Sequence, residues 1–274
     1  RLIKEGHVTW EVAVSKFGNY REVGNALRLP YMAALRNLRN MTEAGADLDS
    51  TVAMLRDPER VKHSKQMPFR FWSAAKALSG CGGQPIRGLF YGNYQDPFTM
   101  TRDPFQSKPV QKALAEALEH STANIPALEG RTLVVVDVSS SMDEAVSRRS
   151  DVTCAEIAAL FGAAVARRMP DTLVAAFSED YKFLDVSQMP IPDGVRHILK
   201  ATSHNATYAH RPIQHLTRSR SRVDRIILFS DMQCYTDSVW GTTELPTALA
   251  EYKARVNAKV KFISVDLAGY STAA

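Results

Sequence analysis

Cysteine is scarce in this chain of 274 residues, and its scarcity excludes several kinds of protein. The sequence holds three cysteines with wide spacings, Cys81, Cys154 and Cys234. A disulfide framework or a zinc knuckle needs closely spaced and usually even-numbered cysteines. We therefore expect a protein of a reducing compartment and place it in the cytoplasm.

Long hydrophobic runs are absent as well. No apolar segment approaches the ~20 residues that a membrane-spanning helix needs. The opening segment "RLIKEGHVTW" lacks the apolar core of a secretion signal. The sequence thus predicts no membrane association. Because the first residue is not methionine, we interpret the chain as a fragment or a processed product.

The common motifs of nucleotide and zinc chemistry are missing. The sequence has no Walker A loop and no Gly-x-Gly-x-x-Gly. None of the seven histidines forms a His-x-x-His or His-x-x-x-His pair. His204 and His210 flank Thr207, and we interpret them as polar loop residues. These absences predict that the protein is not an enzyme.

The formal net charge is +5, and its distribution along the chain is uneven. Residues 1–120 contain 17 Lys and Arg against 12 Asp and Glu, whereas the remaining residues contain 17 of each kind. The basic excess therefore lies in the first part of the chain. Such an excess permits a polyanionic partner without demonstrating one.

The first part of the chain has the period of α-helices. The apolar residues of "LPYMAALRNLRNM" form one stripe, namely Met32, Leu35, Leu38 and Met41. Arg36 and Arg39 project from the other side of that predicted helix. Another helix is predicted to end near Pro58, and a third to begin at Pro68 and end near Gly80. Short helices with short links predict a HEAT-like helical-repeat segment.

A change in composition separates two predicted domains. Residues 80–108 are rich in Gly, Pro and aromatic side chains, which predicts a long connecting loop. The amphipathic segment "VQKALAEALEHS" that follows predicts a helix with one apolar side, formed by Val110, Leu114, Ala117 and Leu118. We assign residues 1–120 to the helical-repeat segment and residues 121–274 to a second domain.

The second domain alternates between strands and helices. Buried strands are predicted over 131–137, 172–178, 181–186, 225–231 and 260–267. Helices are predicted over 152–169, 193–202, 211–219 and 244–255. Apolar strands separated by amphipathic helices predict a doubly wound parallel sheet of the Rossmann-like α/β class, covered on both faces. In such sheets ligands bind at the carboxyl ends of the strands.

Polar oxygen-bearing residues gather at that end. Asp137 and the serines 139–141 follow the first strand, Asp231 ends the fourth, and Thr207 lies on a loop between them. Carboxylates and hydroxyls without a histidine or thiolate suit Mg²⁺ or Mn²⁺. The alternative is a turn whose serines and aspartate cap backbone groups.

The motif Asp137-x-Ser139-x-Ser141, with Thr207 and Asp231, resembles the metal-ion-dependent adhesion site of von Willebrand factor A (vWA) domains. The resemblance covers roughly residues 131–267. It implies that the serines ligate the metal directly, Thr207 directly or through water, and the aspartates mainly through water. One coordination position would stay open for an acidic group of a protein ligand. "HNATYAH" departs from the family pattern around the threonine, so Thr202 is the alternative ligand.

The segment "ALAEALEHSTANIPALEGRTLVVVDVSSSM" resembles the junction in Ro autoantigen (TROVE module) proteins of bacterial and phage type. "LPYMAALRNLRNMTEAG" and "MPFRFWSAAKALSG" are similar to successive helical elements of the same family. The resemblance implies a scaffold of helical repeats that binds Y-like noncoding RNA and misfolded or single-stranded RNA ends. An exoribonuclease or an RNA-repair enzyme is an implied partner. Ro proteins have a longer helical module, so this chain would carry only its last part.

Six basic residues of the net-positive part lie on or near predicted helices and are the candidate RNA contacts: Arg36, Arg39, Lys62, Lys65, Arg70 and Lys76. They would contact mainly phosphates, which makes the affinity salt-dependent. Tyr31, Phe71 and Trp72 are predicted to be core residues. We interpret the basic stretch "RSRSRVDR" as a solvated loop at the amino edge of the sheet, with contact to an RNA backbone as the alternative.

Three functions stay open at this point. The favoured one is a non-catalytic RNA-binding scaffold with a metal-dependent interaction site. The second is a vWA module that serves a chaperone ATPase or an insertion machinery without any RNA. The third is a metal-dependent hydrolase, for which the sequence shows no catalytic base.

Overall fold

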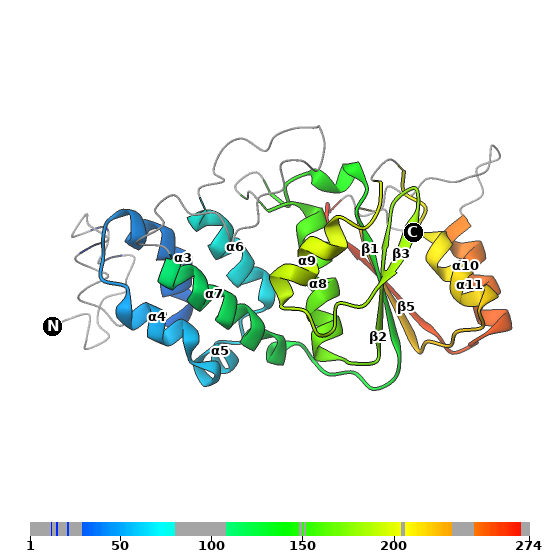
Figure 1. The fold of residues 1–274 in the computed structure, drawn as a ribbon, viewed down its shortest axis with the longest axis horizontal. Helices are drawn as coiled ribbons and strands as arrows, with labels where there is room; N and C mark the ends of the chain where they lie inside the picture. The colour runs from blue at the N-terminus through cyan, green and yellow to red at the C-terminus, as the bar shows by residue number, and fades with distance from the viewer. Residues whose placement is uncertain are drawn as a thin grey trace. The chain divides into compact units, whose positions relative to one another are not determined.

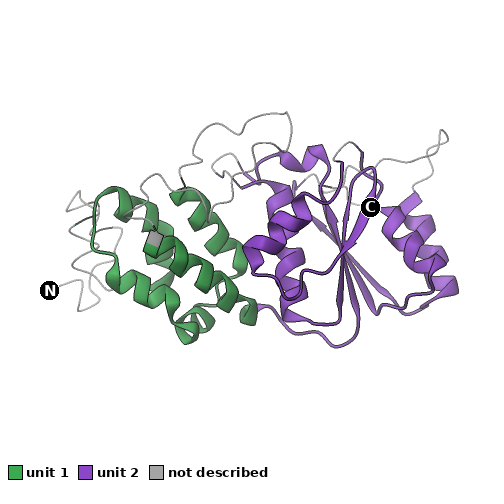
Figure 2. Cartoon of the chain, in the orientation of Figure 1, with its two compact units in different colours: residues 1–82, 95–124 green, residues 83–94, 125–274 purple. Residues whose placement is uncertain are grey.

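The computed structural model describes residues 29–79, 108–147, 150, 152–203, 206–231 and 244–269, with the single positions 12, 15 and 21. The predicted connecting loop lies outside these residues except for Lys108. The chain divides into two compact units, residues 1–82 with 95–124 and residues 83–94 with 125–274 (Figure 2). No described helix is both long and apolar enough to cross a bilayer.

Unit 1 is helical in the described residues. Its elements are α3 (Tyr31–Glu43), α4 (Asp49–Arg56), α5 (Pro58–Ser64), α6 (Pro68–Leu78), α7 (Lys108–Ser121) and the 3-10 turn η2 (Thr122–Asn124). Helix α7 packs against α4, α5 and α6 (Figure 1). Its predicted apolar side is buried at Val110, Leu114, Ala117 and Leu118. These helices bear out the predicted helical segment.

Two prolines begin helices in unit 1. Pro58 and Pro68 each occupy the first turn, where a missing N–H costs no hydrogen bond. The Asp57 carboxylate precedes Pro58 and accepts hydrogen bonds from the backbone N–H groups of Glu59 and Arg60 at 3.0 and 3.2 Å. The sequence indicated where α4 ends but did not predict α5, because Pro58 was interpreted only as a stop.

Unit 2 is a five-stranded sheet with helices on both faces. The strands are β1 (Thr132–Asp137), β2 (Thr172–Phe177), β3 (Tyr181–Leu184), β4 (Arg225–Ser230) and β5 (Lys261–Asp266), in the order β3-β2-β1-β4-β5. One face carries α8 (Cys154–Arg168) and α9 (Ile191–Leu199). The other carries α10 (His210–Arg218) and α11 (Glu244–Arg255) (Figure 1). The predicted doubly wound α/β class is confirmed.

One strand differs from the prediction of a parallel sheet. β3 pairs with β2 in the antiparallel sense, with Phe177 opposite Tyr181. Only residues 178–180 join the two strands, and a parallel crossover needs a dozen or more residues. The sheet is therefore mixed, with its antiparallel strand at one edge.

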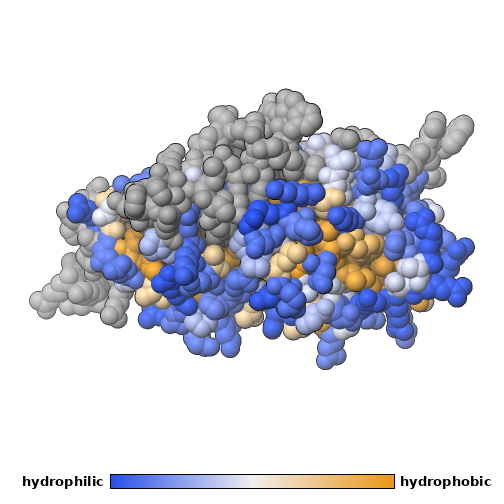
Figure 3. Space-filling model, viewed as in Figure 1, coloured by the Kyte–Doolittle hydropathy of each residue, from blue (hydrophilic) through white to orange (hydrophobic). Residues whose placement is uncertain are grey.

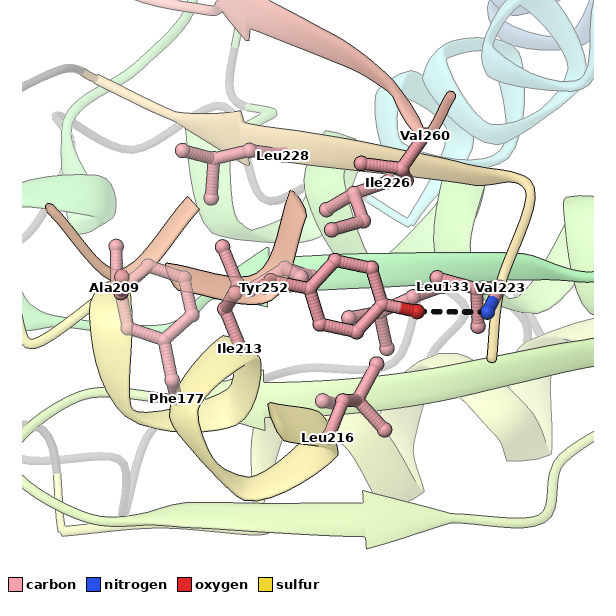
Figure 4. Close-up of a cluster of buried hydrophobic side chains, with 13 residues drawn as sticks. Leu133, Phe177, Ala209, Ile213, Leu216, Val223, Ile226, Leu228, Tyr252 and Val260 are labelled. Atoms are coloured by element: carbon pink, nitrogen blue, oxygen red, sulfur yellow. Dashed lines mark hydrogen bonds between the residues drawn. The ribbon is translucent and has the colours of Figure 1, made fainter. Parts of the chain in front are cut away.

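The core beneath α10 and α11 holds both helices on the sheet. It joins Leu133 and Leu228 of the central strands to Ile213 of α10 and Tyr252 of α11, all buried (Figure 4). The Tyr252 hydroxyl accepts a hydrogen bond from the Val223 N–H at 2.8 Å and donates one to the Ser221 carbonyl at 3.0 Å. The core thus also fixes the turn that leads from α10 into β4.

Candidate functional site

The carboxyl edge of the sheet brings the ends of β1 and β4 together. The two strands are parallel neighbours, with Val136 opposite Phe229. The next pair in this register is Asp137 and Ser230, and Asp231 follows one residue later. Asp137, Ser230 and Asp231 are all buried. The predicted approach of two strand ends at this edge is therefore present.

Asp137 is held by hydrogen bonds on both carboxylate oxygens. Its Oδ1 accepts from the backbone N–H and the hydroxyl of Ser139 at 3.0 and 2.7 Å. Its Oδ2 accepts from the Ser230 hydroxyl at 2.6 Å. Because the Ser139 hydroxyl donates its hydrogen bond to Asp137, the lone pairs of its oxygen stay available to a cation. The arrangement orients a carboxylate and a neutral oxygen ligand together.

Ser141 completes the cluster on the β1 side. It lies in the 3-10 turn η3 (Ser140–Asp143), which begins directly after Ser139. The Ser139 and Ser141 hydroxyl oxygens are 3.2 Å apart. This distance suits two oxygens that ligate the same ion. The structure thus gathers Asp137, Ser139 and Ser141 as the motif predicts.

Thr207 is buried at the same edge of the sheet. The backbone N–H of its neighbour Tyr208 donates to the carbonyl of Ser178, which follows β2, at 2.9 Å. β2 ends with Phe177 opposite Asp137. Thr202, the alternative ligand, accepts a hydrogen bond from the Ser178 hydroxyl at 2.9 Å. Ser178, the residue after β2, therefore holds Thr202 directly and the chain at Thr207 through its neighbour Tyr208.

The site carries concentrated negative charge in a buried place. Burial raises the pKa of Asp137 to about 6, the hydrogen bonds from Ser139 and Ser230 oppose the rise, and the Asp231 charge adds to it. Burial also raises the pKa of the nearby Cys154 thiol to about 11, assisted by the charges of Asp231, Glu144 and Asp266. The Asp137 and Asp231 carboxylates thus repel each other here, and a bound cation would relieve that repulsion.

The donors fit a hard divalent cation. Within the described residues, no three His, Cys, Asp or Glu side chains gather closely enough to hold a metal by themselves. Hydroxyl oxygens would have to supply the other donors, and Ser139 and Ser141 are placed to do so. An all-oxygen set of this kind suits Mg²⁺ or Mn²⁺ better than zinc or copper.

A second Asp-x-Ser turn shows what is special about the site. Asp185 Oδ1 accepts from the backbone N–H and the hydroxyl of Ser187 at 3.2 and 2.8 Å, as Asp137 does from Ser139. Asp185, however, is exposed. The local turn is therefore not the distinguishing feature. Burial, a further serine and a neighbouring strand end distinguish the Asp137 site.

Ser230 is the site residue that sequence reasoning missed. Its hydroxyl contacts Asp137 more closely than any other donor described above, at 2.6 Å. The register of parallel strands could have revealed it, because the residue before a strand-end aspartate faces the last residue of the neighbouring strand.

The predicted RNA contacts on α3 lie on its exposed side. Arg36 and Arg39 are exposed, while Leu35, Leu38 and Met41 are buried on the other side of the helix. The Arg39 Nε lies 3.0 Å from the Glu43 Oε1, so an acidic neighbour partly compensates its charge. Arg36 has no ion pair within the described part of the chain. The two arginines are therefore electrostatically unequal.

Three further predicted contacts are also exposed. Lys62 lies on α5, and Lys65 ends that helix in a left-handed conformation with φ of 55°. The guanidinium of Arg70 lies over the Phe69 ring, 4.9 Å from its centroid. These side chains are available at the surface of unit 1, but their relation to RNA stays a prediction.

Lys76 does not fit the prediction of an outward contact. Only 8% of Lys76 is exposed, and it lies one helical turn after Trp72, which is fully buried. Residues four apart share one face of a helix. The sequence already contained this signal, because Phe71 and Trp72 were predicted to be core residues, and both are. Lys76 belongs to the packed side of α6.

The stretch "RSRSRVDR" lies where the sequence placed it, in the turn between α10 and the start of β4. Arg218, Arg220 and Arg222 are exposed. Arg225, the first residue of β4, instead donates hydrogen bonds to the Gly130 carbonyl at 3.3 Å and to the Thr132 hydroxyl at 2.8 Å. The last arginine of the stretch thus has a structural role.

The sheet order and the Asp-x-Ser-x-Ser edge define a vWA-type domain that follows a helical unit. The Ro60 vWA domain family matches residues 131–273, and the TROVE domain family matches residues 3–88. The chain therefore belongs to the Ro60 family, with part of a TROVE module and a Ro60-type vWA domain.

Relatives of known name agree with that assignment. The chain is 26% identical over 253 residues to "RNA-binding protein RO60" of Deinococcus radiodurans, which covers 85% of this chain and 42% of the relative. It is 38% identical over 77 residues to "Telomerase protein component 1" of Rattus norvegicus, which covers 26% of this chain and 3% of the relative. The chain thus spans less than half of either relative.

A solved structure has the same fold. The crystal structure of the Deinococcus radiodurans RO (RSR) protein matches with a TM-score of 0.69 and 23% sequence identity. The match covers 93% of this chain and 49% of that one. It extends the shared fold over both units.

Proposed function

We propose that this chain is part of a non-catalytic RNA-binding scaffold of the Ro type, with a metal-dependent interaction site in its vWA unit. The observation that carries the proposal is the pairing of a TROVE segment with a Ro60-type vWA domain in one chain. The name of the Deinococcus relative and the exposed cations of unit 1 support it.

The RNA would be held mainly through its phosphates. Arg36, Lys62 and Lys65 are exposed and have no ion pair among the described residues. Cations of this kind neutralise phosphates without reading a base sequence. The RNAs proposed are Y-like noncoding RNA and the single-stranded ends of misfolded RNA. An exoribonuclease or an RNA-repair enzyme in the cytoplasm would be the protein partner.

The metal site would act in recognition. Ser139 and Ser141 would bind Mg²⁺ or Mn²⁺ with Thr207. Asp137 and Asp231 would contact the ion mainly through water and balance its charge. The cation would supply an electrophilic centre for an acidic group of a protein ligand. Neutral hydroxyl ligands leave more positive charge for that group than carboxylate ligands would.

The chemistry of the edge gives no support to catalysis. A hydrolase would need a base close to the metal. His210 is the histidine of the described residues that comes nearest to Thr207 in sequence. It is buried, and its Nε2 lies 2.7 Å from the Glu244 Oε2. This contact joins the first residue of α10 to the first residue of α11.

The proposal is tested by two titrations of the chain. In the first, a labelled RNA hairpin with a single-stranded 3′ tail should bind more tightly than the same hairpin without the tail. In the second, calorimetry should show one Mn²⁺ bound by the parent and none by Asp137→Ala. Metal binding without RNA binding would favour the vWA module that works without RNA. RNA binding with an unchanged Mn²⁺ isotherm in Asp137→Ala would reject the site.

A further inference from the structure

Residues 125–274 of the vWA unit contain as many Lys and Arg as Asp and Glu, but the two kinds of charge are separated. The thirty residues 194–223 contain six Lys and Arg and no Asp or Glu. The cations are Arg196, Lys200, Arg211, Arg218, Arg220 and Arg222. The acidic residues Asp137, Asp231 and Asp266 lie instead at strand ends along the carboxyl edge. Arg196 and Lys200 belong to α9 and its end, and the other four cations belong to α10 and the turn after it.

Helix α10 turns its basic side outward. Arg211, His215 and Arg218 follow at intervals of four and three, which places them on one side of the helix. His215 and Arg218 are exposed, whereas Ile213 and Leu216 are buried in the core. In Figure 3 the surface over α10 and α11 is mainly hydrophilic.

The turn after α10 presents its arginines on a rigid support. The Tyr252 hydroxyl accepts a hydrogen bond from the Val223 N–H (Figure 4) and donates one to the Ser221 carbonyl. The Asn257 side-chain amide donates to the Val223 carbonyl at 2.8 Å. Both partners come from α11 or its end. Arg220 holds a left-handed conformation with φ of 51° in this turn. A turn that is fixed at so many points loses little entropy when its arginines bind a ligand.

Arg218 and Arg220 have no ion pair within the residues that the structure describes, and both are exposed. Arg222 has a long one, with Asp224 at 3.8 Å. Arg211 is more constrained, because its guanidinium lies 4.1 Å from the centroid of the Tyr208 ring. The exposed arginines of this segment without an ion pair among the described residues therefore lie at the carboxyl end of α10 and in the turn after it.

Aromatic rings lie beside this charge. The Tyr181 hydroxyl and the His215 Nδ1 are 3.1 Å apart, and the Phe183 and His215 ring centroids are 4.9 Å apart. Tyr181 and Phe183 pack against the core and are half-buried. A basic surface with accessible rings is typical of single-stranded nucleic-acid binding, because unpaired bases stack on aromatic side chains.

We infer that Tyr181, Arg211, His215, Arg218 and Arg220, named here the α10 strip, form a second contact for single-stranded RNA. The inference rests on the proposed RNA binding and extends it from unit 1 to the vWA unit. The arginines would contact phosphates, and Tyr181 with His215 would stack against a base. The acidic residues Glu179 and Asp180 precede Tyr181 in the turn from β2 and bound the strip at that end. The strip is also distinct from the metal ligands.

The test compares three variants of the full chain with the parent, using fluorescein-labelled oligo(U) at several salt concentrations. The double substitution Arg218→Ala with Arg220→Ala should lower affinity roughly tenfold and reduce the salt slope by about 1.4, since each phosphate contact to a single strand contributes about 0.7. Tyr181→Leu should lower affinity about fivefold and leave the slope unchanged, because stacking releases no counterions. Lys253→Ala with Lys259→Ala is the matched control. It removes two exposed cations of the same unit and should leave both quantities unchanged.

Each other outcome overturns the inference. If the parent binds oligo(U) and the arginine variant binds it with the same affinity and slope, the strip is ordinary surface while the proposed function stands. An equal loss in the lysine control would mean that net charge alone matters. If the parent does not bind oligo(U), both the proposed binding of single-stranded RNA and the role of the α10 strip are rejected. Displacement of oligo(U) by equimolar poly(glutamate) would identify an acidic protein as the ligand instead.

Discussion

Asp137 combines full burial with hydrogen bonds from three donors, which is costly for a carboxylate that stays ionised. Burial disfavours its charged form, and the donors compensate only part of that cost, since the pKa remains raised at about 6. A carboxylate kept at such a cost is typical of a binding site rather than of a structural cap.

The raised pKa of Asp137 predicts a pH dependence of metal binding. The metal needs the ionised carboxylate, so a proton competes with it below about pH 6. The Mn²⁺ affinity should be constant above that value and fall about tenfold for each pH unit below it. Calorimetric titrations between pH 5 and pH 8 measure this.

Ser230→Ala should move the midpoint of that pH profile upward. Ser230 lowers the pKa of Asp137 through its hydrogen bond, so its removal makes protonation easier. Ser187→Ala is the control, because it removes a serine that donates to an exposed aspartate in the same kind of turn. A profile that does not move in Ser230→Ala would contradict the role given to this hydroxyl.

Lys76 provides the opposite case, a charged residue on a packed face. We predict that Lys76→Met leaves the RNA affinity and its salt slope unchanged, because only 8% of Lys76 is exposed and methionine preserves its packed stem. Lys62→Met on the exposed side of α5 is the matched variant and should lower the slope by about one. A lower slope for Lys76→Met in salt titrations would restore the original prediction.

At the scale of elements, helix α3 separates packing from charge. Leu35, Leu38 and Met41 attach it to unit 1, and Arg36 and Arg39 stand on the opposite side. A helix supported in this way can lose its arginines with little change in stability, since exposed substitutions usually stay within about 0.5 kcal/mol.

We therefore predict unequal effects of the two arginines. Arg36→Ala should reduce the salt slope of RNA binding by about one. Arg39→Ala should reduce it less, because Glu43 already compensates part of its charge. Glu43→Ala should raise the affinity for the same reason. Filter binding across a range of salt concentrations measures all three, and equal slopes throughout would place the RNA elsewhere.

Much of this arrangement could be predicted from periodicity and strand ends. The apolar stripes of α3 and α7, the alternation in unit 2 and the gathering of Asp137, Ser139 and Ser141 follow from local pattern. The antiparallel β3 was missed because the length of its connection was not weighed. Ser230 was missed because its environment depends on strand register, and Lys76 because the packed face of its own helix was not followed one turn beyond Trp72.

At the scale of the whole molecule, the predicted RNA contacts of unit 1 and the proposed metal site of unit 2 belong to different compact units. Each unit has its own buried core. The residues of the proposed metal site can bind a cation without RNA. The exposed lysines and arginines of unit 1 can contact RNA phosphates without a metal.

RNA binding should therefore survive removal of divalent ions. We predict that EDTA changes the affinity for a tailed RNA hairpin less than twofold while Mn²⁺ binding is lost. Circular dichroism serves as the control for folding of the chain. A complete loss of RNA binding with an unchanged spectrum would show that a metal bridges the protein to a phosphate.

The position of β1 in the sheet has a consequence for the lifetime of the site. β1 is hydrogen-bonded to β2 and β4 and is buried throughout, whereas several residues of the edge strand β5 are exposed. Central strands exchange their amide hydrogens only when the whole unit opens. Asp137 is the last residue of β1, so this end of the site opens only when the whole unit unfolds. Thr207 lies outside the sheet, between α9 and α10, so strand pairing does not hold its end of the site. A cation shared by both ends would slow the exchange of that segment toward the rate of the strand.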